Sequence, residues 1–183
     1  MKKKDIITVP ITAVRFPNKA YGFVDGEKVI VKNALPGQKV SAQIIKKRGG
    51  NIEARLLEVL EHSVCERESG FCSHFADCGG CTYQAMQRQA ELDMKEQQVK
   101  QLLSEANIQI EQWEGIEPSP LETGYRNKCE FSFGDAYKDG PLALGMRKKM
   151  SHYEVVTLKD SNIIDADFLK IIDSALSLFQ ENH

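Results

Sequence analysis

The sequence predicts an α+β protein: a small β-barrel of the OB type, then a cysteine-rich metal loop, a helix and an antiparallel sheet with a C-terminal helix. Three observations predict it. Short strand-like runs separated by turn residues fill residues 6–60, four of the five cysteines lie within residues 65–81, and helical apolar spacing appears only after residue 87. We divide the chain into a barrel domain at 1–61 and a second domain at 62–183.

The composition is that of an ordinary globular protein. The chain has 183 residues, of which 42% are apolar and 27% charged, and this excludes a disordered tail. No run approaches the roughly 18–20 consecutive apolar residues that a membrane-spanning helix needs. The basic N-terminal tip, Met1–Asp5, has no apolar segment behind it and is not a secretory signal. We therefore expect a cytoplasmic monomer that does not enter a membrane.

Five strands are predicted in the first third of the chain. Asp25-Gly26 is a hairpin signal, Leu35-Pro36-Gly37 interrupts the chain, and Lys46–Gly50 is read as a basic turn. Five short strands in about 55 residues predict a small closed barrel. The expected strands are Ile6–Phe16, Tyr21–Val24, Lys28–Val31, Val40–Ile45 and Asn51–Leu60.

The net charge of −2 hides a strong asymmetry. Residues 1–60 carry 12 Lys and Arg against 5 Asp and Glu, which is +7, whereas residues 61–183 carry 12 against 21, which is −9. Basic barrels with exposed aromatic rings bind single-stranded nucleic acid by following phosphates and stacking bases. Alternatively, the charges only solvate loop tips and the rings fill the barrel. Candidate RNA contacts are Arg15, Lys19, Lys46, Lys47 and Arg48, with Tyr21 or Phe23 as stacking rings.

The crowded cysteines indicate a metal site in a reducing compartment. Cys72, Cys78 and Cys81 have C-x5-C-x2-C spacing, and Gly79-Gly80 permits a tight turn between the last two. Three local thiolates and one distant ligand are a usual way to hold a [4Fe–4S] cluster. A zinc ribbon would instead need two C-x2-C knuckles, of which the sequence has one. Free, buried thiols are the remaining alternative.

These cysteines, followed by Thr82-Tyr83-Gln84 and a Gln- and Lys-rich helix, resemble the RNA uracil-5-methyltransferase family. Ala34–Gln38 is similar to the Leu-Pro-Gly segment of that family's TRAM domain. Gly124–Phe131 and Leu144–Lys149 are similar to two of its later strands. The resemblance covers almost all of the chain, and a TRAM domain joined to an iron–sulfur motif is most like the 23S rRNA branch.

The resemblance implies methylation of uridine C5 in 23S rRNA or tRNA with S-adenosylmethionine. In that reaction a cysteine attacks uracil C6, C5 is methylated, and the C5 proton is removed. The family's catalytic domain is Rossmann-like and lies C-terminal to these elements. The chain has no G-x-G-x-x-G after a strand and no cysteine beyond Cys129. We therefore expect no catalytic residue here and interpret the chain as the N-terminal RNA-recognition portion of such an enzyme.

The fourth cluster ligand departs from the family pattern. The resemblance implies a cysteine just after the strand Tyr153–Leu158, and Ser161 stands there. The open possibilities are a serine ligand, a replacement by Cys65, an open iron or reduced cluster stability. Cys129 lies in a predicted strand and is expected to pack as a small apolar residue. The competing hypothesis is a stand-alone RNA-binding module whose zinc is held by Cys65, Cys72, Cys78 and Cys81.

The remainder of the chain supplies two helices and a strand meander. One helix is predicted at Gln87–Asn107 and the other from about Asp165, with strands at Tyr125–Phe133, Leu142–Met146 and Tyr153–Leu158. Basic residues on this sheet either contact phosphates or only solvate a hairpin tip. The expected partner is a uridine-containing RNA loop, whose target base must leave its stack. The candidate contacts are Arg126, Lys128, Arg147, Lys148 and Lys149.

Overall fold

The computed structural model describes residues 1–181 and confirms the α+β class. The chain forms two compact units. The first comprises Met1–Glu68 and Ala85–Glu117, and the second comprises Ser69–Gln84 and the chain from Pro118 onward. The cysteine segment is thus inserted into the sequence of the first unit but belongs to the second.

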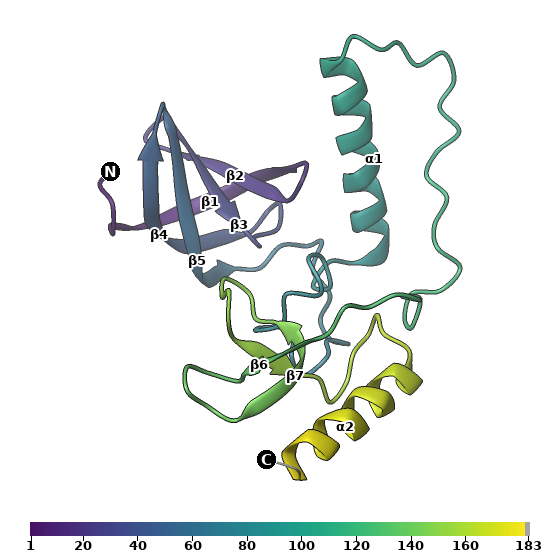
Figure 1. Ribbon diagram of the computed structural model, residues 1–183. Helices are drawn as coiled ribbons and strands as arrows, with labels where there is room; N and C mark the ends of the chain where they lie inside the picture. Colours follow the sequence, from purple (N-terminus) through teal and green to yellow (C-terminus); the bar gives the residue numbers. More distant parts are fainter. Residues whose placement is uncertain (182–183) are drawn as a thin grey trace. The chain divides into compact units, whose positions relative to one another are not determined.

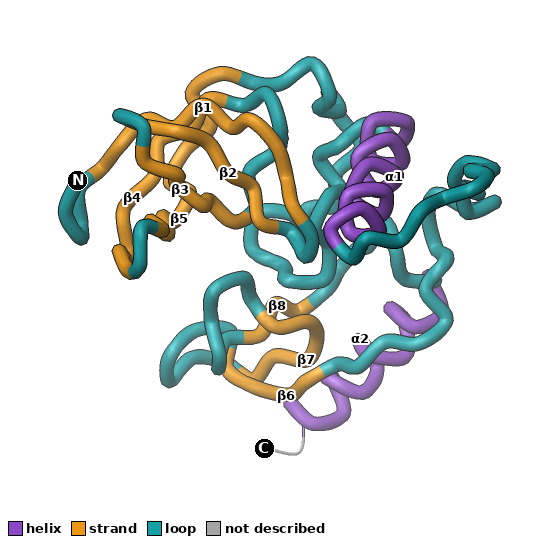
Figure 2. Tube along the Cα trace, turned by 90° about the horizontal axis from the view of Figure 1, so that it is seen from above, coloured by secondary structure: helices purple, strands orange, loops and turns teal. Residues whose placement is uncertain are grey.

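The first unit contains a closed five-stranded barrel (Figures 1 and 2). Its strands follow the order β1-β2-β3-β5-β4, in which β3 and β5 run parallel and every other pair is antiparallel. This closure leaves no free sheet edge and confirms the predicted barrel. The strands are β1 (Ile6–Arg15), β2 (Lys19–Val24), β3 (Glu27–Lys32), β4 (Lys39–Arg48) and β5 (Asn51–Glu61).

Alternating apolar residues fill the barrel because every second side chain of a strand points inward. The largest fully buried side chains are aliphatic: Val9, Val29, Val31, Val40, Ile44 and Ile52. Gly22 lets β1 and β2 approach closely, since a Cβ there would lie 1.9 Å from the Pro10 carbonyl oxygen. The barrel core is therefore built from the β-branched residues that predicted the strands.

The basic run after Ile45 is strand and not turn, which corrects the sequence interpretation. β4 continues through Arg48, and its residues pair with β5 as far as Asn51. Only Gly49 and Gly50 make the turn, both with positive φ (57° and 76°) that glycine adopts without strain. The pairing that β5 offers overrides the weak β-propensity of lysine.

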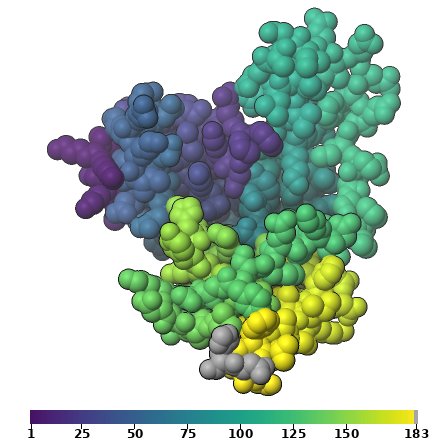
Figure 3. All heavy atoms as spheres, viewed as in Figure 1, coloured from purple at the N-terminus to yellow at the C-terminus, as the bar shows by residue number. Residues whose placement is uncertain are grey.

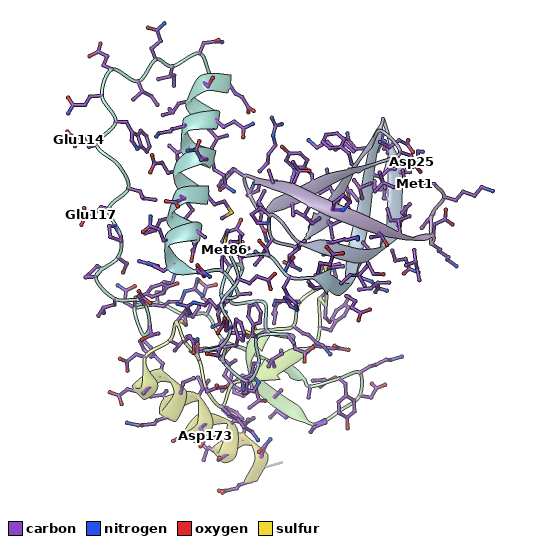
Figure 4. All side chains as sticks on the ribbon, turned by 180° about the vertical axis from the view of Figure 1, so that it is seen from behind. Met1, Asp25, Met86, Glu114, Glu117 and Asp173 are labelled. Atoms are coloured by element: carbon purple, nitrogen blue, oxygen red, sulfur yellow. The ribbon has the colours of Figure 1, made fainter. Side chains whose placement is uncertain are left out.

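Helix α1 (Arg88–Glu105) falls in the barrel unit, although the sequence division at residue 61 grouped it with the cysteines. The backbone N–H of Gln87 donates to the Cys65 carbonyl at 2.8 Å, and Gln98 Nε2 donates to the Val14 carbonyl at 3.0 Å. The helix buries none of its own residues. Beyond it the chain runs without helix or strand past Glu114 and Glu117 (Figure 4). Hydrogen bonds rather than an apolar face therefore link α1 to the barrel.

The second unit contains a small antiparallel sheet and helix α2 (Ala166–Glu181), as predicted. The sheet order is β6 (Ser132–Asp135), β7 (Leu142–Arg147) and β8 (Val155–Thr157). The predicted strand Tyr125–Phe133 is wrong for most of its length. Of these residues only Ser132 and Phe133 are strand, since the ladder between β6 and β7 begins with Ser132 opposite Gly145. Arg126 makes a single bridge to Ile164.

Helix α2 packs on this sheet through Ile172 and Leu176. The atoms of the helix, yellow in Figure 3, lie beside the green atoms of the second unit. Asp165 Oδ1 accepts the N–H of Asp167 at 2.8 Å, which caps the start of the helix. The core that results is small, and one of its members is a cysteine. It comprises Cys78, Leu144, Leu158, Ile164, Ile172 and Leu176.

Neither helix within residues 1–181 combines the length and the apolar character required to cross a membrane.

Candidate functional site

The cysteine loop, residues 69–84, brings its three thiols into one region of the second unit. Cys72 and Cys78 are buried and Cys81 is half-buried. Cys72 Sγ donates to Gln84 Oε1 at 3.5 Å, and Gln84 Nε2 lies 4.0 Å from Cys81 Sγ. The Gly80 N–H points at Cys78 Sγ at 3.3 Å. The Gly-Gly turn thus aims a backbone donor at sulfur.

Backbone contacts hold this loop against the end of β7. Gly79 N–H donates to the Arg147 carbonyl at 2.9 Å, and Lys149 N–H donates to the Asp77 carbonyl at 2.6 Å. The Lys149 side chain also donates to the Phe75 carbonyl at 2.6 Å, and its ammonium lies 4.3 Å from the centre of the Phe75 ring. Lys149 therefore fixes the loop through both its backbone and its side chain, a role that no sequence pattern indicated.

The site favours protonated thiols when no metal is bound. Burial raises the pKa of Cys78, and it raises the pKa of Cys81 to about 11. The neighbouring Cys72 adds to both effects, while Arg126 and Lys149 oppose them. Burial also lowers the pKa of Lys149. Binding of a metal centre would therefore release protons, and the two cations would stabilise the thiolates that it needs.

The segment that carries Ser161 lies against the segment that carries Cys72. Asp160 accepts hydrogen bonds from the Ser73 N–H at 2.9 Å and the Ser73 hydroxyl at 2.6 Å, and these lower the pKa of Asp160. Lys159 N–H donates to His74 Nε2 at 2.9 Å. The Ser161 hydroxyl itself accepts the N–H groups of Ile163 and Ile164, each at 3.3 Å. The two segments are thus joined, and the serine oxygen takes part in a local turn.

The donor types fit an iron–sulfur centre, because three sulfurs of one loop are accompanied by a backbone donor and two cations. In residues 1–181, however, no three His, Cys, Asp or Glu side chains are grouped closely enough to hold a metal ion. Cys65 belongs to the first unit, where its thiol lies 3.1 Å from the Ser63 hydroxyl. Cys129 packs against the core of the second unit.

The basic candidates on the barrel lie at the β4–β5 end and at the end of β1. Lys46 and Arg48 are exposed, and Lys47 pairs with Glu27 at 2.7 Å. Arg15 pairs with Glu105 of α1 at 3.1 Å. Exposed ion pairs of this kind are worth at most about 1 kcal/mol, so a phosphate can replace the carboxylate.

The basic candidates of the second unit also have local partners. Lys128 pairs with Glu130 at 3.2 Å, Lys148 with Glu154 at 3.1 Å, and Arg147 donates to the His152 carbonyl at 3.0 Å. Arg126 is half-buried, and its positive charge acts to lower the pKa of the Cys81 thiol. The charges of Arg126 and Lys149 therefore favour the thiolate forms of Cys78 and Cys81, a role that the sequence-based assignment to phosphate binding did not include.

Comparison with known proteins places these features in a class. No family model matches the chain. It is 38% identical to an uncharacterized RNA methyltransferase of Caldanaerobacter subterraneus, over 94% of this chain and 38% of that protein. It is 31% identical to the 23S rRNA (uracil(1939)-C(5))-methyltransferase RlmD of Pseudomonas entomophila, over 84% of this chain and 34% of the relative. The chain thus spans between a third and two fifths of these relatives.

A solved structure has the same fold. The tRNA (uracil-54, C5)-methyltransferase of Pyrococcus abyssi, in complex with S-adenosyl-L-homocysteine, aligns with a TM-score of 0.62 at 19% identity, covering 94% of this chain and 37% of that one. The chain has a closed barrel and a cysteine loop, and its sequence is similar to those of RNA methyltransferases. It is therefore a relative of RNA methyltransferases. In sequence the chain is similar to RNA methyltransferases, among them a 23S rRNA uracil-C5 methyltransferase, and in fold it is similar to a tRNA uracil-C5 methyltransferase.

Proposed function

We propose that this chain is the RNA-recognition and iron–sulfur-binding portion, N-terminal in position, of an RNA uracil-5-methyltransferase acting on 23S rRNA or tRNA. The observation that carries the proposal is the likeness to RNA methyltransferases over 94% of the chain, which includes the whole cysteine loop. The chain spans 38% of that relative, and methyl transfer from S-adenosylmethionine is assigned to the whole enzyme.

The barrel supplies the RNA-binding surface in this proposal. Its strand order is that of an OB barrel, a fold that binds single strands through a basic groove and stacked bases. Lys46, Lys47 and Arg48 extend along the solvent-exposed end of β4, where they can contact successive phosphates. Phosphate contacts position the RNA, and contacts with unstacked bases specify it.

The cysteine loop holds a [4Fe–4S] cluster in this proposal, with Cys72, Cys78 and Cys81 as three ligands. Ser161 is the fourth candidate, since its neighbours on both sides contact the loop, and Cys65 is the alternative. When bound, the cluster supplies covalent links among segments that hydrogen bonds alone now join. The chain's own residues orient the site: Lys149 fixes the loop, and the Gly80 N–H stabilises the Cys78 thiolate.

The RNA-binding part is tested with a uridine-containing RNA hairpin and a salt titration of the dissociation constant. Counterion release predicts a steep slope of log affinity against log salt. Replacing Lys46, Lys47 and Arg48 together by alanine removes three phosphate contacts and should reduce that slope by about 2. The charge-matched control replaces Lys2, Lys3 and Lys4, and it should change the slope less. An affinity without salt dependence, or equal losses in the two variants, would contradict the proposal.

A further inference from the structure

A polar groove of about 390 Å³ lies between the barrel and helix α1, entirely within the first unit. One wall is the outer face of β1, β2, β3 and β5. Tyr21, Ile30 and Glu53 are successive neighbours across that face, and they alternate with inward-pointing core residues. The other wall is a single stripe of α1. Its members, spaced by three and four residues, are Gln98, Gln101, Leu102 and Glu105.

The helical wall is unusual because it is mostly polar where it faces a sheet. A helix that packs on a barrel ordinarily presents an apolar stripe, whereas α1 buries none of its residues. Gln98 Nε2 donates to the Val14 carbonyl and Arg15 Nη2 donates to Glu105, so the helix is attached at the β1 side of the groove. The groove's size is at the lower end of the range for ligand pockets and suits one nucleotide.

The groove contains a free aromatic surface. Phe16, at the end of β1, lines the groove and is 61% exposed. The Tyr21 ring in the same groove has the Lys28 ammonium 4.1 Å from its centre. Phe16 therefore offers the open ring face on which a base can stack, and base–aromatic stacking is worth about 1–3 kcal/mol.

The charges of the groove separate the positions of a phosphate and a base. Arg15 and Lys19 lie with Phe16 around the β1–β2 turn, whereas Glu53 on the barrel wall would repel a phosphate placed beside it. Glu105 pairs with Arg15 at 3.1 Å, and a phosphate bound to Arg15 would replace this carboxylate. Side-chain amides of Gln98 and Gln101 can hydrogen-bond the edge of a neutral base. A base thus fits inside, with its phosphate at the rim.

We propose that this groove binds one unstacked nucleotide of single-stranded RNA, with its base stacked on Phe16 and its phosphate on Arg15 and Lys19. The inference rests on the proposed RNA-binding function and adds a defined subsite to it. The ligand is a single strand because a base within a duplex is stacked on both faces and its Watson–Crick edge is occupied by its partner.

The test measures binding of a fluorescently labelled uridine-rich octaribonucleotide to the full 183-residue chain at several salt concentrations. Phe16→Leu should weaken binding about tenfold without changing the salt slope, because it removes stacking and no charge. The matched control is Tyr137→Leu, which removes an equally exposed ring (61%) from the second unit and should leave binding unchanged. Arg15→Ala should reduce the salt slope by somewhat less than 1.

The outcomes separate the groove from the wider function. If Phe16→Leu binds the octamer as tightly as the wild type while the triple variant of Lys46, Lys47 and Arg48 loses binding, the groove is not a nucleotide site. The proposed RNA-binding function would then still hold. Equal affinity for the single-stranded octamer and for its duplex would also contradict the proposal that the groove binds an unstacked nucleotide. If the wild-type chain binds RNA without salt dependence, both the proposed nucleotide groove and the proposed RNA-binding function are wrong. Competition of the octamer by an acidic peptide of equal charge would show a general anion site instead.

Discussion

The two units are stabilised in different ways. The barrel closes through five paired strands around large aliphatic side chains that are completely buried, such as Ile44 and Ile52. The second unit has strands of three to six residues, and its six core residues each retain 4–8% exposure. One of those residues is Cys78. The barrel therefore has a core of aliphatic side chains alone, whereas the smaller core of the second unit includes a residue of the cysteine loop.

The largest effect is expected from Cys78→Ser. Cys78 is both a core residue and a proposed cluster ligand, so its loss should destabilise the second unit by about 4 kcal/mol or more and abolish iron binding. Thermal unfolding followed by circular dichroism, together with iron content, measures both. Cys129→Ser is the control, because Cys129 packs against the same core without being a proposed ligand. Equal losses in the two variants would mean that the effect is packing alone.

A comparable but local effect is expected from Ile44→Ala. Ile44 is 1% exposed in the barrel, and truncation of a buried isoleucine costs about 2–5 kcal/mol. Hydrogen exchange should show faster opening of β1, β4 and β5 with unchanged protection in β7 and α2. Uniform loss of protection throughout the chain would contradict the separation of the molecule into two units.

A smaller effect is expected from Lys149→Met. This change keeps the aliphatic stem but removes the hydrogen bond to the Phe75 carbonyl and the cation near the thiols. We expect a stability loss of about 1–2 kcal/mol and weaker retention of iron against a chelator. Lys138→Met, in the exposed loop between β6 and β7, should change neither quantity. Iron retention equal to that of the wild type would remove Lys149 from the site.

The smallest effect concerns RNA affinity. Glu27→Gln frees Lys47, and we expect binding of the uridine-containing hairpin to tighten about twofold. The Lys47 hydrogen bond lowers the pKa of Glu27, so this carboxylate is ionised at every pH above its ordinary pKa of 4.5. The gain should therefore be the same at pH 6 and pH 8. Glu58→Gln, which removes an exposed carboxylate of β5, is the control. The same gain there would indicate a general charge effect.

The sequence predicted the barrel well because its strands alternate β-branched and polar residues and its turns carry glycine. It misjudged Lys46–Arg48, since cross-strand pairing with β5 cannot be read from a local basic run. The sequence also predicted a strand from Tyr125 to Phe133, because apolar residues recur there. Pairing with β7 begins only at Ser132.

The site was predictable in part. Cysteine spacing identified the loop, and the family resemblance identified the position of Ser161, whose neighbour Asp160 contacts Ser73. The roles of Lys149 and Phe16 were not predictable, because each depends on a segment distant in sequence. Lys149 contacts a loop about 74 residues earlier, and Phe16 shares its groove with a helix some 80 residues later.

The most direct test of the central claim is the content of iron, zinc and acid-labile sulfide per chain, measured on protein purified without oxygen, with its visible spectrum. The account predicts near four irons and four sulfides, with a broad absorption band near ~400 nm. Ser161→Cys should then increase the stability of the cluster. Absence of iron and sulfide would contradict the account, and one zinc bound by four sulfurs would establish the closed cysteine site in its place.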